Sequence, residues 1–309
     1  MSTSDEAEAE EADIYCASCG TAEVDHIKLK NCDDCDLVRY CSDKCQQDHR
    51  PNHEAICKER VVVLRDEILF RLPESSRGDC PICCLPISLD NLKSTLQTCC
   101  SKLICNGCVY ANMLRERGNN LKHRCPFCRH PMPKTKKENQ KNRKKRVAVN
   151  DPVALRELGG EHYDKGDYSG AVPYLTEASA FGDMYAHYLL SVMYGEGKGV
   201  EKDDEMASYH LEEAAIGGHH LARYKLAVRE RENDRFDRAV KHFIIAANLG
   251  DDASIKQLRI GYTEGKVRKE DFASALRAHQ AAVDGMKSPQ REAAAKAEAA
   301  GLLIDDCRA

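Results

Sequence analysis

The chain has 309 residues, of which 42% are apolar and 31% are charged, and its formal net charge is −4 at pH 7. This composition is typical of a soluble globular protein with two or three domains, and it excludes a fibrous chain or one that is disordered throughout. The small net charge gives no general basis for nucleic-acid binding. Sixteen of the 17 cysteines lie between Cys16 and Cys128, so the fold of the remaining residues must be stabilised by interactions other than those of cysteines.

Residues 1–13 are predicted to form an acidic disordered tail, because they contain six acids and neither a base nor an apolar run. This pattern is neither a signal peptide nor a transit peptide. No later stretch approaches eighteen apolar residues, so we expect no membrane partner and a cytoplasmic or nuclear location. In a reducing compartment, cysteines at short regular spacings are expected to bind metal rather than to form disulfides.

Residues 14–58 contain eight potential metal ligands in four closely spaced pairs. They are Cys16, Cys19, Cys32, Cys35, Cys41, Cys45, His53 and Cys57. Thiolate and imidazole ligands suit zinc, and a structural zinc site closes at four ligands, so this block predicts two zinc ions. Its few large apolar side chains are too few for an independent core, and metal binding must supply the remaining stability.

The block resembles a MYND-type zinc finger in the segments Tyr40–Ser42 and Cys45–Gln46, and in the position of His53. The resemblance implies an interleaved arrangement of the two zinc sites. By it, Cys16, Cys19, Cys41 and Cys45 hold one ion, and Cys32, Cys35, His53 and Cys57 hold the other.

MYND fingers often bind proline-containing peptides in an exposed groove, so the resemblance also implies a peptide or client protein as partner. Arg50, just before Pro51, stands where the family often has a tryptophan, and this chain contains no tryptophan. The alternative is that the block is a folded spacer in which zinc is only structural.

Residues 59–74 are predicted to form a helical connector. Val61, Leu64, Ile68 and Leu72 share one helical face, which favours a helix packed between two zinc modules. Pro73 is expected to end this helix.

Residues 75–133 contain a second set of eight cysteines in four pairs. They are Cys80, Cys83, Cys99, Cys100, Cys105, Cys108, Cys125 and Cys128, which leaves Cys84 and Cys307 over. Two more zinc ions are predicted, four in all. Cys99 and Cys100 are adjacent, and both can bind one ion only if the backbone turns sharply. Cys84, His123 and His130 are therefore alternatives to Cys99.

The second block resembles an all-cysteine RING-type zinc finger, in which the first and third pairs share one zinc and the second and fourth share the other. The five-residue step from Cys100 to Cys105 matches this variant. The resemblance implies a ubiquitin ligase that binds a ubiquitin-conjugating enzyme. The implied contacts of that enzyme are Ile82, Pro126 and Phe127, and the implied ubiquitin clamp is Arg129. Alternatively, these side chains fill a small core or are solvated.

Residues 134–150 are predicted to be a basic linker, since the run from Lys134 to Arg146 has eight bases against one acid. A nuclear-import signal or a nucleic-acid patch would share this composition, but a solvated tether is equally consistent with it.

Residues 151–289 are predicted to be helical repeats, because small-residue helix ends recur at intervals of 36, 32 and 35 residues. The first unit resembles a tetratricopeptide repeat, and the glycine-rich turn Gly195–Val200 resembles that of Sel-like repeats. Such arrays commonly hold partner proteins. We expect small residues to let neighbouring helices pack closely, namely Gly159, Ala171, Ala214, Ala215, Ala246 and Ala247. Residues 290–309 are expected to form a terminal capping helix.

The sequence thus predicts a multidomain protein with two small zinc-stabilised cross-brace modules followed by an all-α helical repeat solenoid. The expected function is a RING-type ubiquitin ligase with the repeats as client scaffold. The alternative is a non-enzymatic zinc-dependent adaptor. Nucleic-acid binding has less support because no finger shows a recognition helix. No pattern of catalytic side chains is evident, so no catalytic residue is predicted.

Overall fold

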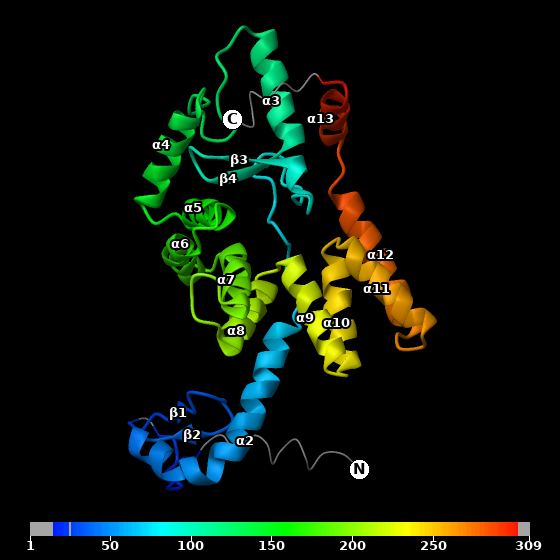
Figure 1. The fold of residues 1–309 in the computed structure, drawn as a ribbon. Helices are drawn as coiled ribbons and strands as arrows, with labels where there is room; N and C mark the ends of the chain where they lie inside the picture. Colours follow the sequence, from blue (N-terminus) through cyan, green and yellow to red (C-terminus); the bar gives the residue numbers. More distant parts are fainter. Residues whose placement is uncertain (1–14, 25, 302–309) are drawn as a thin grey trace. The chain divides into compact units, whose positions relative to one another are not determined.

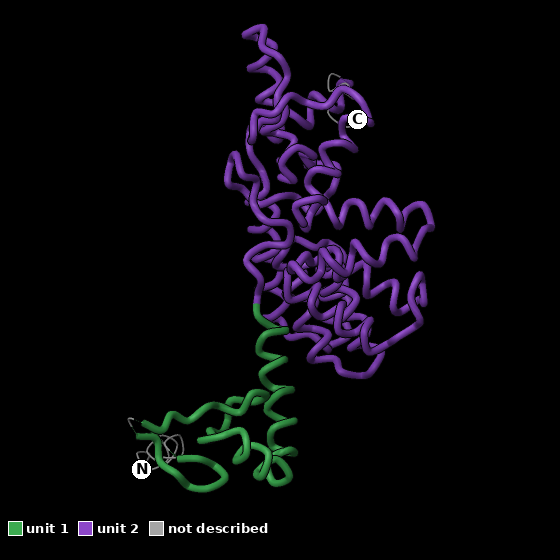
Figure 2. The backbone as a smooth tube through the Cα atoms, turned by 90° about the vertical axis from the view of Figure 1, so that its left-hand side faces the viewer, with its two compact units in different colours: residues 1–71 green, residues 72–309 purple. Residues whose placement is uncertain are grey.

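The computed structural model describes residues 15–24 and 26–301. The chain divides into two compact units, Met1–Arg71 and Leu72–Ala309, which Figure 2 distinguishes by colour. Each unit is described separately below. The predicted tail of residues 1–13 and the last part of the predicted capping helix, residues 302–309, lie outside the described residues.

The first unit is built from a short β-hairpin and one long helix (Figure 1). Strands β1 (Lys30–Asn31) and β2 (Arg39–Tyr40) pair antiparallel, and helix α2 (Asp43–Leu69) follows. The Ser42 side chain accepts a hydrogen bond from the amide of Cys45, which is the usual way to start a helix. The buried core consists of cysteines and Tyr40 rather than aliphatic side chains.

The predicted connector is not a separate helix. It is the second half of α2, which continues without a break from the cysteine block and ends at Leu69, four residues before Pro73. Within the first unit Val61 and Ile68 are 39% and 46% exposed, and the expected packing of this stripe between two zinc modules stays a prediction.

The second unit begins with the second cysteine block. It contains a 3-10 turn η2 (Asn91–Lys93), strands β3 (Ser94–Gln97) and β4 (Lys102–Cys105), and helix α3 (Asn106–Gly118). The two strands form a hairpin in which Ser94 pairs with Cys105 and Gln97 with Lys102. The small core joins apolar side chains to the cysteines, and its members include Ile87, Ile104 and Val109.

The basic run predicted as a linker forms helix α4 (Lys136–Val147) instead of a solvated tether. Thr135 caps its start by accepting from the amide of Glu138. Two of its arginines form ion pairs with acids at the start of the repeats, Arg143 with Glu161 and Arg146 with Asp151. These ion pairs offset charge repulsion between the bases of the run and hold α4 against the start of the repeats.

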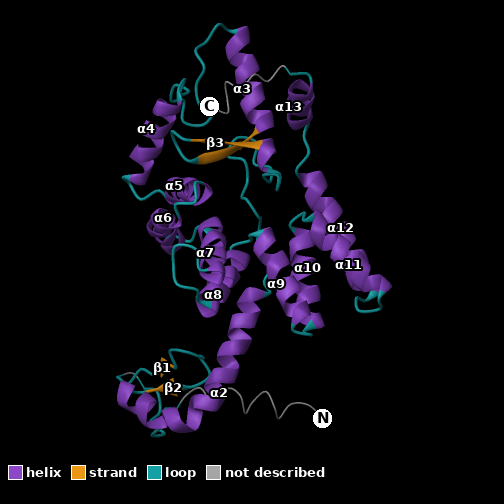
Figure 3. Cartoon of the chain, in the orientation of Figure 1, coloured by secondary structure: helices purple, strands orange, loops and turns teal. Residues whose placement is uncertain are grey.

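The rest of the chain is helical, as Figure 3 shows. The helices are α5 (Pro152–Asp164), α6 (Tyr168–Ala180), α7 (Met184–Glu196), α8 (Asp204–Ile216), α9 (His220–Glu232), α10 (Phe236–Asn248), α11 (Asp252–Thr263) and α12 (Lys269–Gly285). Successive helices pack as antiparallel hairpins, and each hairpin packs on the next. The predicted fold class, two cysteine-rich modules followed by an all-α repeat array, is confirmed.

The small residues of the array lie where helices approach closely, as expected. A Cβ added to Gly159 would lie 2.8 Å from Cγ of Leu175, on the facing helix. The alanines predicted to sit at helix contacts are fully buried; they are Ala171, Ala214, Ala215, Ala246 and Ala247. Leu155, Leu175 and Leu190 fill the spaces between the helices of the first hairpins. The array therefore has a core of its own that needs no metal.

The C-terminal helix does not act as the predicted cap of the array. Helix α13 (Pro289–Ala299) packs against α3 of the second cysteine block, and it lies beside α3 in Figure 1. An alanine-rich helix offers a flat surface, which suits close packing on another helix better than filling a groove between repeat helices.

The repeat array and the second cysteine block contact one another at several points within the second unit. Ser76 and His220 of the array are joined by a 3.3 Å hydrogen bond, and Thr98 also donates to Asn139 of α4 at 2.8 Å. A Cβ on Gly218 would lie 2.4 Å from the Ser75 carbonyl oxygen. The block is therefore held by elements from α4 to α13 rather than by its sequence neighbours alone.

Candidate metal centres

The sixteen predicted ligands form four clusters in the described part of the chain. The clusters are Cys16, Cys19, Cys41 and Cys45; Cys32, Cys35, His53 and Cys57; Cys80, Cys83, Cys105 and Cys108; and Cys99, Cys100, Cys125 and Cys128. Within each cluster the ligand atoms lie within 4.8 Å of one another. Tetrahedral zinc with Zn–S bonds near 2.3 Å requires sulfurs roughly 3.8 Å apart. Each cluster can therefore hold one zinc ion.

In the first block the two clusters interleave along the chain, as the resemblance implied. The hairpin β1–β2 and the first turn of α2 bring Cys41 to 3.5 Å from Cys19 and 3.6 Å from Cys45, sulfur to sulfur. Further along α2, Nε2 of His53 lies 3.1 Å from Sγ of Cys35. Helix α2 supplies ligands to both clusters, so both zinc ions would anchor the same helix.

The second block interleaves in the same way, and it brings the adjacent cysteines into one cluster. Sγ of Cys99 lies 3.3 Å from that of Cys128, and Sγ of Cys100 lies 3.9 Å from that of Cys125. The turn between β3 and β4 makes this possible. The amide of Ser101 donates to the Gln97 carbonyl oxygen at 2.8 Å, and Ser101 has a positive φ of 56°. The backbone thus turns as sharply as adjacent ligands require.

Cys84 belongs to none of the four clusters, because it has a different place in the first turn of the block. Four of the five Cys-x2-Cys pairs are followed directly by a residue with positive φ, namely Gly20, Asp36, Cys84 and Arg129, whereas the pair Cys105 and Cys108 leads into α3. The amide of Cys84 donates to the Cys80 carbonyl oxygen at 2.8 Å, which closes the turn, while its side chain is exposed. Cys84 is therefore a turn residue that happens to be a cysteine.

The two histidine alternatives to Cys99 also lie outside the clusters. Nδ1 of His123 is 2.8 Å from a carboxylate oxygen of Glu116, and His130 is exposed.

The thiols within a cluster oppose one another's ionisation. A hydrogen bond from Cys105 lowers the pKa of Cys80, while the same contact raises the pKa of Cys105. Cys125 and Cys99 form a second such pair, in which the pKa of Cys125 is lowered and that of Cys99 is raised. Four thiolates so close together require a cation, and a dication with a preference for sulfur fits this donor set.

We expect Cys99→Ser to reduce the zinc content by one ion per chain and to destabilise the second block, because a closed tetrahedral site loses a ligand. Cys84→Ser is the matched control, since it makes the same chemical change at an exposed position outside the clusters. Metal analysis and thermal unfolding of both variants test this. Zinc loss from Cys84→Ser but not from Cys99→Ser would exchange the two assignments.

The residues predicted to meet a conjugating enzyme lie on the two turns that carry the first and last cysteine pairs. Ile82 is 43% exposed and Phe127 is 44% exposed, whereas Pro126 is half-buried. The ammonium of Lys102 lies 5.9 Å from the centroid of the Phe127 ring. Ile82 and Phe127 are therefore not core side chains, and the interpretation that they fill a small core is wrong for both.

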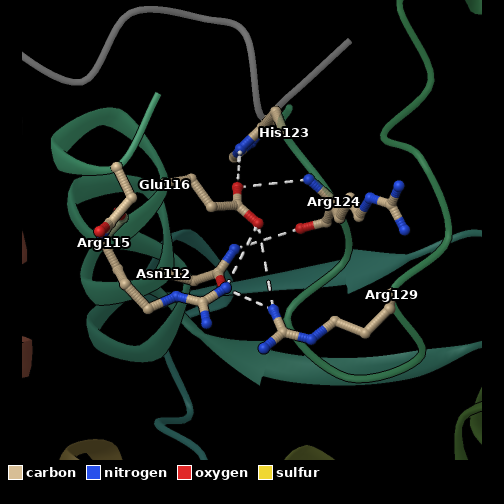
Figure 4. A network of polar contacts seen from close by, with 7 residues as sticks. Asn112, Arg115, Glu116, His123, Arg124 and Arg129 are labelled. Carbon is tan, nitrogen blue, oxygen red and sulfur yellow. Dashed lines mark hydrogen bonds and ion pairs between the residues drawn. The ribbon is translucent and has the colours of Figure 1, made fainter. Parts of the chain in front are cut away.

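Arg129 takes part in a polar network with α3, shown in Figure 4. Its guanidinium donates to Oδ1 of Asn112 at 3.0 Å and lies 4.0 Å from Oε1 of Glu116. The other carboxylate oxygen of Glu116 meets His123 at 2.8 Å and the amide of Arg124 at 3.3 Å. Burial raises the pKa of Glu116, but the hydrogen bonds from His123 and Arg124 outweigh it and leave that pKa lowered. The network fixes the last turn of the block to α3.

The first block carries a groove, as its resemblance to peptide-binding MYND fingers implied, although the sequence did not identify the residues that line it. It has a volume of about 610 Å³ and runs along α2. Its lining includes Tyr40, Arg50 and Val61, and it carries four acids, Asp33, Asp34, Asp43 and Glu54, against the two bases Arg50 and Lys58. Arg50, at the position where a tryptophan was expected by resemblance, is thus part of the groove wall. The spacing of Arg50, Glu54 and Lys58 on one helical face is the local signal in the sequence for the charged wall of this groove.

Two family models match parts of this chain. The MYND finger model matches residues 16–57, and the Sel1 repeat model matches residues 185–219 and 221–251. The chain therefore carries a MYND finger, which is a zinc-binding module, and Sel1 repeats in α7–α10. Residues 75–133 lie outside these matches, and their likeness to a RING finger rests on the ligand arrangement alone.

Similar solved structures include two bacterial repeat proteins. One is c5321, a protective antigen of uropathogenic Escherichia coli displaying an SLR fold, with 26% identity over 48% of this chain, 33% of that chain and a TM-score of 0.39. The other is a Sel1 repeat protein from Oxalobacter formigenes, with 25% identity over 53% of this chain, 70% of that chain and a TM-score of 0.41. The match thus spans a third of the first structure. No curated protein matches this chain.

Within residues 15–24 and 26–301, none of the helices has both the length and the apolar character that crossing a bilayer demands. Zinc sites joined to Sel1 repeats, which generally mediate protein–protein interaction, define this chain as a zinc-binding interaction protein.

Proposed function

We propose that the second cysteine block is a RING-type platform for a ubiquitin-conjugating enzyme and that the chain acts as a ubiquitin ligase. The observation that carries this proposal is the cross-brace arrangement, in which the first and third cysteine pairs form one cluster and the second and fourth form the other. Exposed Ile82 and Phe127 then lie on the turns of the first and last pairs, where an apolar anchor can meet a partner.

Such a ligase performs no covalent chemistry of its own. It accelerates transfer by holding the charged conjugating enzyme so that the thioester meets an acceptor amine in the right geometry. Ile82, Pro126 and Phe127 supply the docking surface, and Arg129 contacts the ubiquitin. With its hydrogen bond to Asn112 the Arg129 side chain is still 49% exposed, and a guanidinium has five N–H donors, so it can serve a second acceptor.

The second candidate is a non-enzymatic adaptor, which the groove on the MYND finger favours. A peptide or client protein would bind there or on the repeats, and the second block would serve only as a zinc-stabilised brace. Both functions place the chain in the cytoplasm or the nucleus, where thiols stay reduced.

We expect Ile82→Ala to lose at least tenfold in ubiquitin discharge while it keeps its zinc content and thermal stability. An apolar anchor in a small interface contributes on the order of 2 kcal/mol, which corresponds to more than a tenfold change in binding. Arg129→Ala should also lose transfer without losing zinc. The matched control is Leu92→Ala, because Leu92 belongs to the same block and is 65% exposed.

The measurement is thioester discharge and chain formation with a broad panel of conjugating enzymes and zinc-loaded protein. No discharge from the wild type with any of them would remove the ligase proposal and leave the adaptor. Equal losses in Ile82→Ala and Leu92→Ala would place the docking surface elsewhere.

A further inference from the structure

The side chain of Arg291, in the first turn of α13, reaches the first cluster of the second cysteine block. Its Nη2 donates to Sγ of Cys83 at 3.6 Å and to the Leu85 carbonyl oxygen at 3.1 Å. Its Nη1 donates to the carbonyl oxygens of Pro86 at 2.7 Å and Met286 at 2.8 Å. One guanidinium thus joins a metal ligand, the turn after that ligand and the end of α12.

Helix α13 approaches the block so closely that only glycine fits at the contact. A Cβ added to Gly107 would lie 2.7 Å from the amide nitrogen of Arg291 and 2.9 Å from its Cα. Ala294 and Ala297 of α13 are 1% and 5% exposed, so the small side chains of the helix are buried in this contact. The backbones of α3 and α13 therefore pack against each other at the residue just before the ligand Cys108.

The charge of a loaded cluster suits this arginine. Four thiolates around a dication leave a net charge of −2, and hydrogen bonds from a cation to such thiolates are charge-assisted. Groups that hydrogen-bond to metal ligands orient them, and their loss commonly lowers metal affinity 10- to 100-fold. Conversely, loss of zinc would remove the metal that fixes the backbone from Cys80 to Pro86. The carbonyl oxygens that Arg291 binds would then no longer be held close together.

We propose that α13 is an intramolecular ligand of the zinc-loaded second block, with Arg291 as the positioning residue, so that docking of α13 and zinc binding at one site are coupled. That site is formed by Cys80, Cys83, Cys105 and Cys108. Coupling between two binding events is reciprocal, so zinc strengthens docking by the same factor by which docking strengthens zinc binding. The C-terminal segment consequently reports the zinc state of a site far away in the sequence.

The first test measures zinc affinity site by site in the full-length protein. Arg291→Ala is expected to lower the affinity of one site about tenfold and to leave the other three unchanged. Chelator competition with pulsed alkylation, followed by peptide mapping, shows which cysteines become reactive first. Cys80, Cys83, Cys105 and Cys108 should do so earlier than in the wild type. Lys296→Ala is the matched control, because it removes an exposed cation from the same helix.

A second variant separates the helix contact from the arginine itself. Gly107→Ala should displace α13 and weaken the same site, whereas Gly118→Ala, in the same helix with nothing within 4 Å of the added Cβ, should not. Because both changes break one contact, Gly107→Ala combined with Arg291→Ala should be no weaker in zinc affinity than Gly107→Ala alone.

The effect of zinc on the docking of α13 is measured by hydrogen exchange. Chelation of wild-type protein should raise exchange in residues 289–299 as the second block loses zinc, while the buried helices of the array remain protected. Unchanged exchange in α13 after zinc loss would overturn the proposal. So would an Arg291→Ala variant whose four sites all weaken together, since that would be a general loss of stability.

Discussion

Removal of zinc from the full-length protein should unfold residues 16–57 and 80–128 and leave helices α5–α12 folded. In the first block the buried core is made of ligands and Tyr40, so little remains to hold it once the metal is gone. A structural zinc contributes roughly 10–16 kcal/mol of apparent folding free energy in small fingers, far more than such a core. The array buries its own apolar residues, among them Leu175, Leu190 and Leu258.

This expectation is checked by three measurements on one sample. Metal analysis should give about four zinc ions per chain before chelation. Circular dichroism should retain most of its helical signal afterwards, and hydrogen exchange should rise in the two cysteine blocks and in α13. Added zinc should reverse these changes. A helical signal that disappears together with the metal would show that the array depends on the zinc blocks for its own folding.

The repeat array should also lose stability in mild acid, because buried histidines must be uncharged in the folded state. Burial, helped by the neighbouring His220 and by the cations Lys225, Arg156 and Arg77, lowers the pKa of His219 to about 3. Burial and the neighbouring Arg223 lower the pKa of His242 to about 3 as well. In the unfolded chain both return to about 6.5. Their contribution is complete above pH 6.5 and falls as the pH drops below it, because the unfolded state then binds more protons.

At pH 5 the loss amounts to about 2 kcal/mol for each of these two histidines. His219→Asn tests the assignment, because asparagine does not titrate there and can still cap α9. In the wild type, Nδ1 of His219 accepts from the amide of Ala222 at 3.2 Å. Urea unfolding at pH 7.5 and 5.0 should show a difference between the two pH values that is about 2 kcal/mol smaller in the variant than in the wild type.

His130→Asn is the control for this experiment, since His130 is exposed and lies outside the array. Acid also weakens zinc binding, but that effect is common to all three proteins and cancels in the comparison. If wild type and His219→Asn lost the same stability between the two pH values, His219 would not be the group that titrates.

Ligand spacing made the metal ligands predictable from the sequence, and the resemblance to MYND and RING fingers implied which pairs share an ion. A Cys-x2-Cys pair determines its own turn, because the two ligands and the closing hydrogen bond all lie within a few residues. Even the assignment of Cys84 had a signal: it follows its pair directly, as Gly20 and Asp36 do in the first block, and glycine and aspartate favour left-handed turns.

The contacts that were not predicted are those between distant segments or those that depend on a capping residue. The composition of the basic run suggests a tether, but the run forms helix α4. Thr135 caps the start of this helix, and Asp151 and Glu161 form ion pairs with its arginines. Arg291 is one arginine in an alanine-rich helix, and nothing in that composition shows that it binds near Cys83. The glycine before Cys108 was the one local sign of a close approach.

The docking of α13 on α3 also sets an order of events during synthesis. About 180 residues separate Cys108 from Arg291, and at 5–20 residues per second a ribosome needs roughly 10–40 s to cover them. During that interval the first cluster of the nascent second block has all four of its cysteines but lacks the arginine and the helix that hold it. Its thiolates are therefore most open to oxidation and to metal exchange while the repeats are still being made.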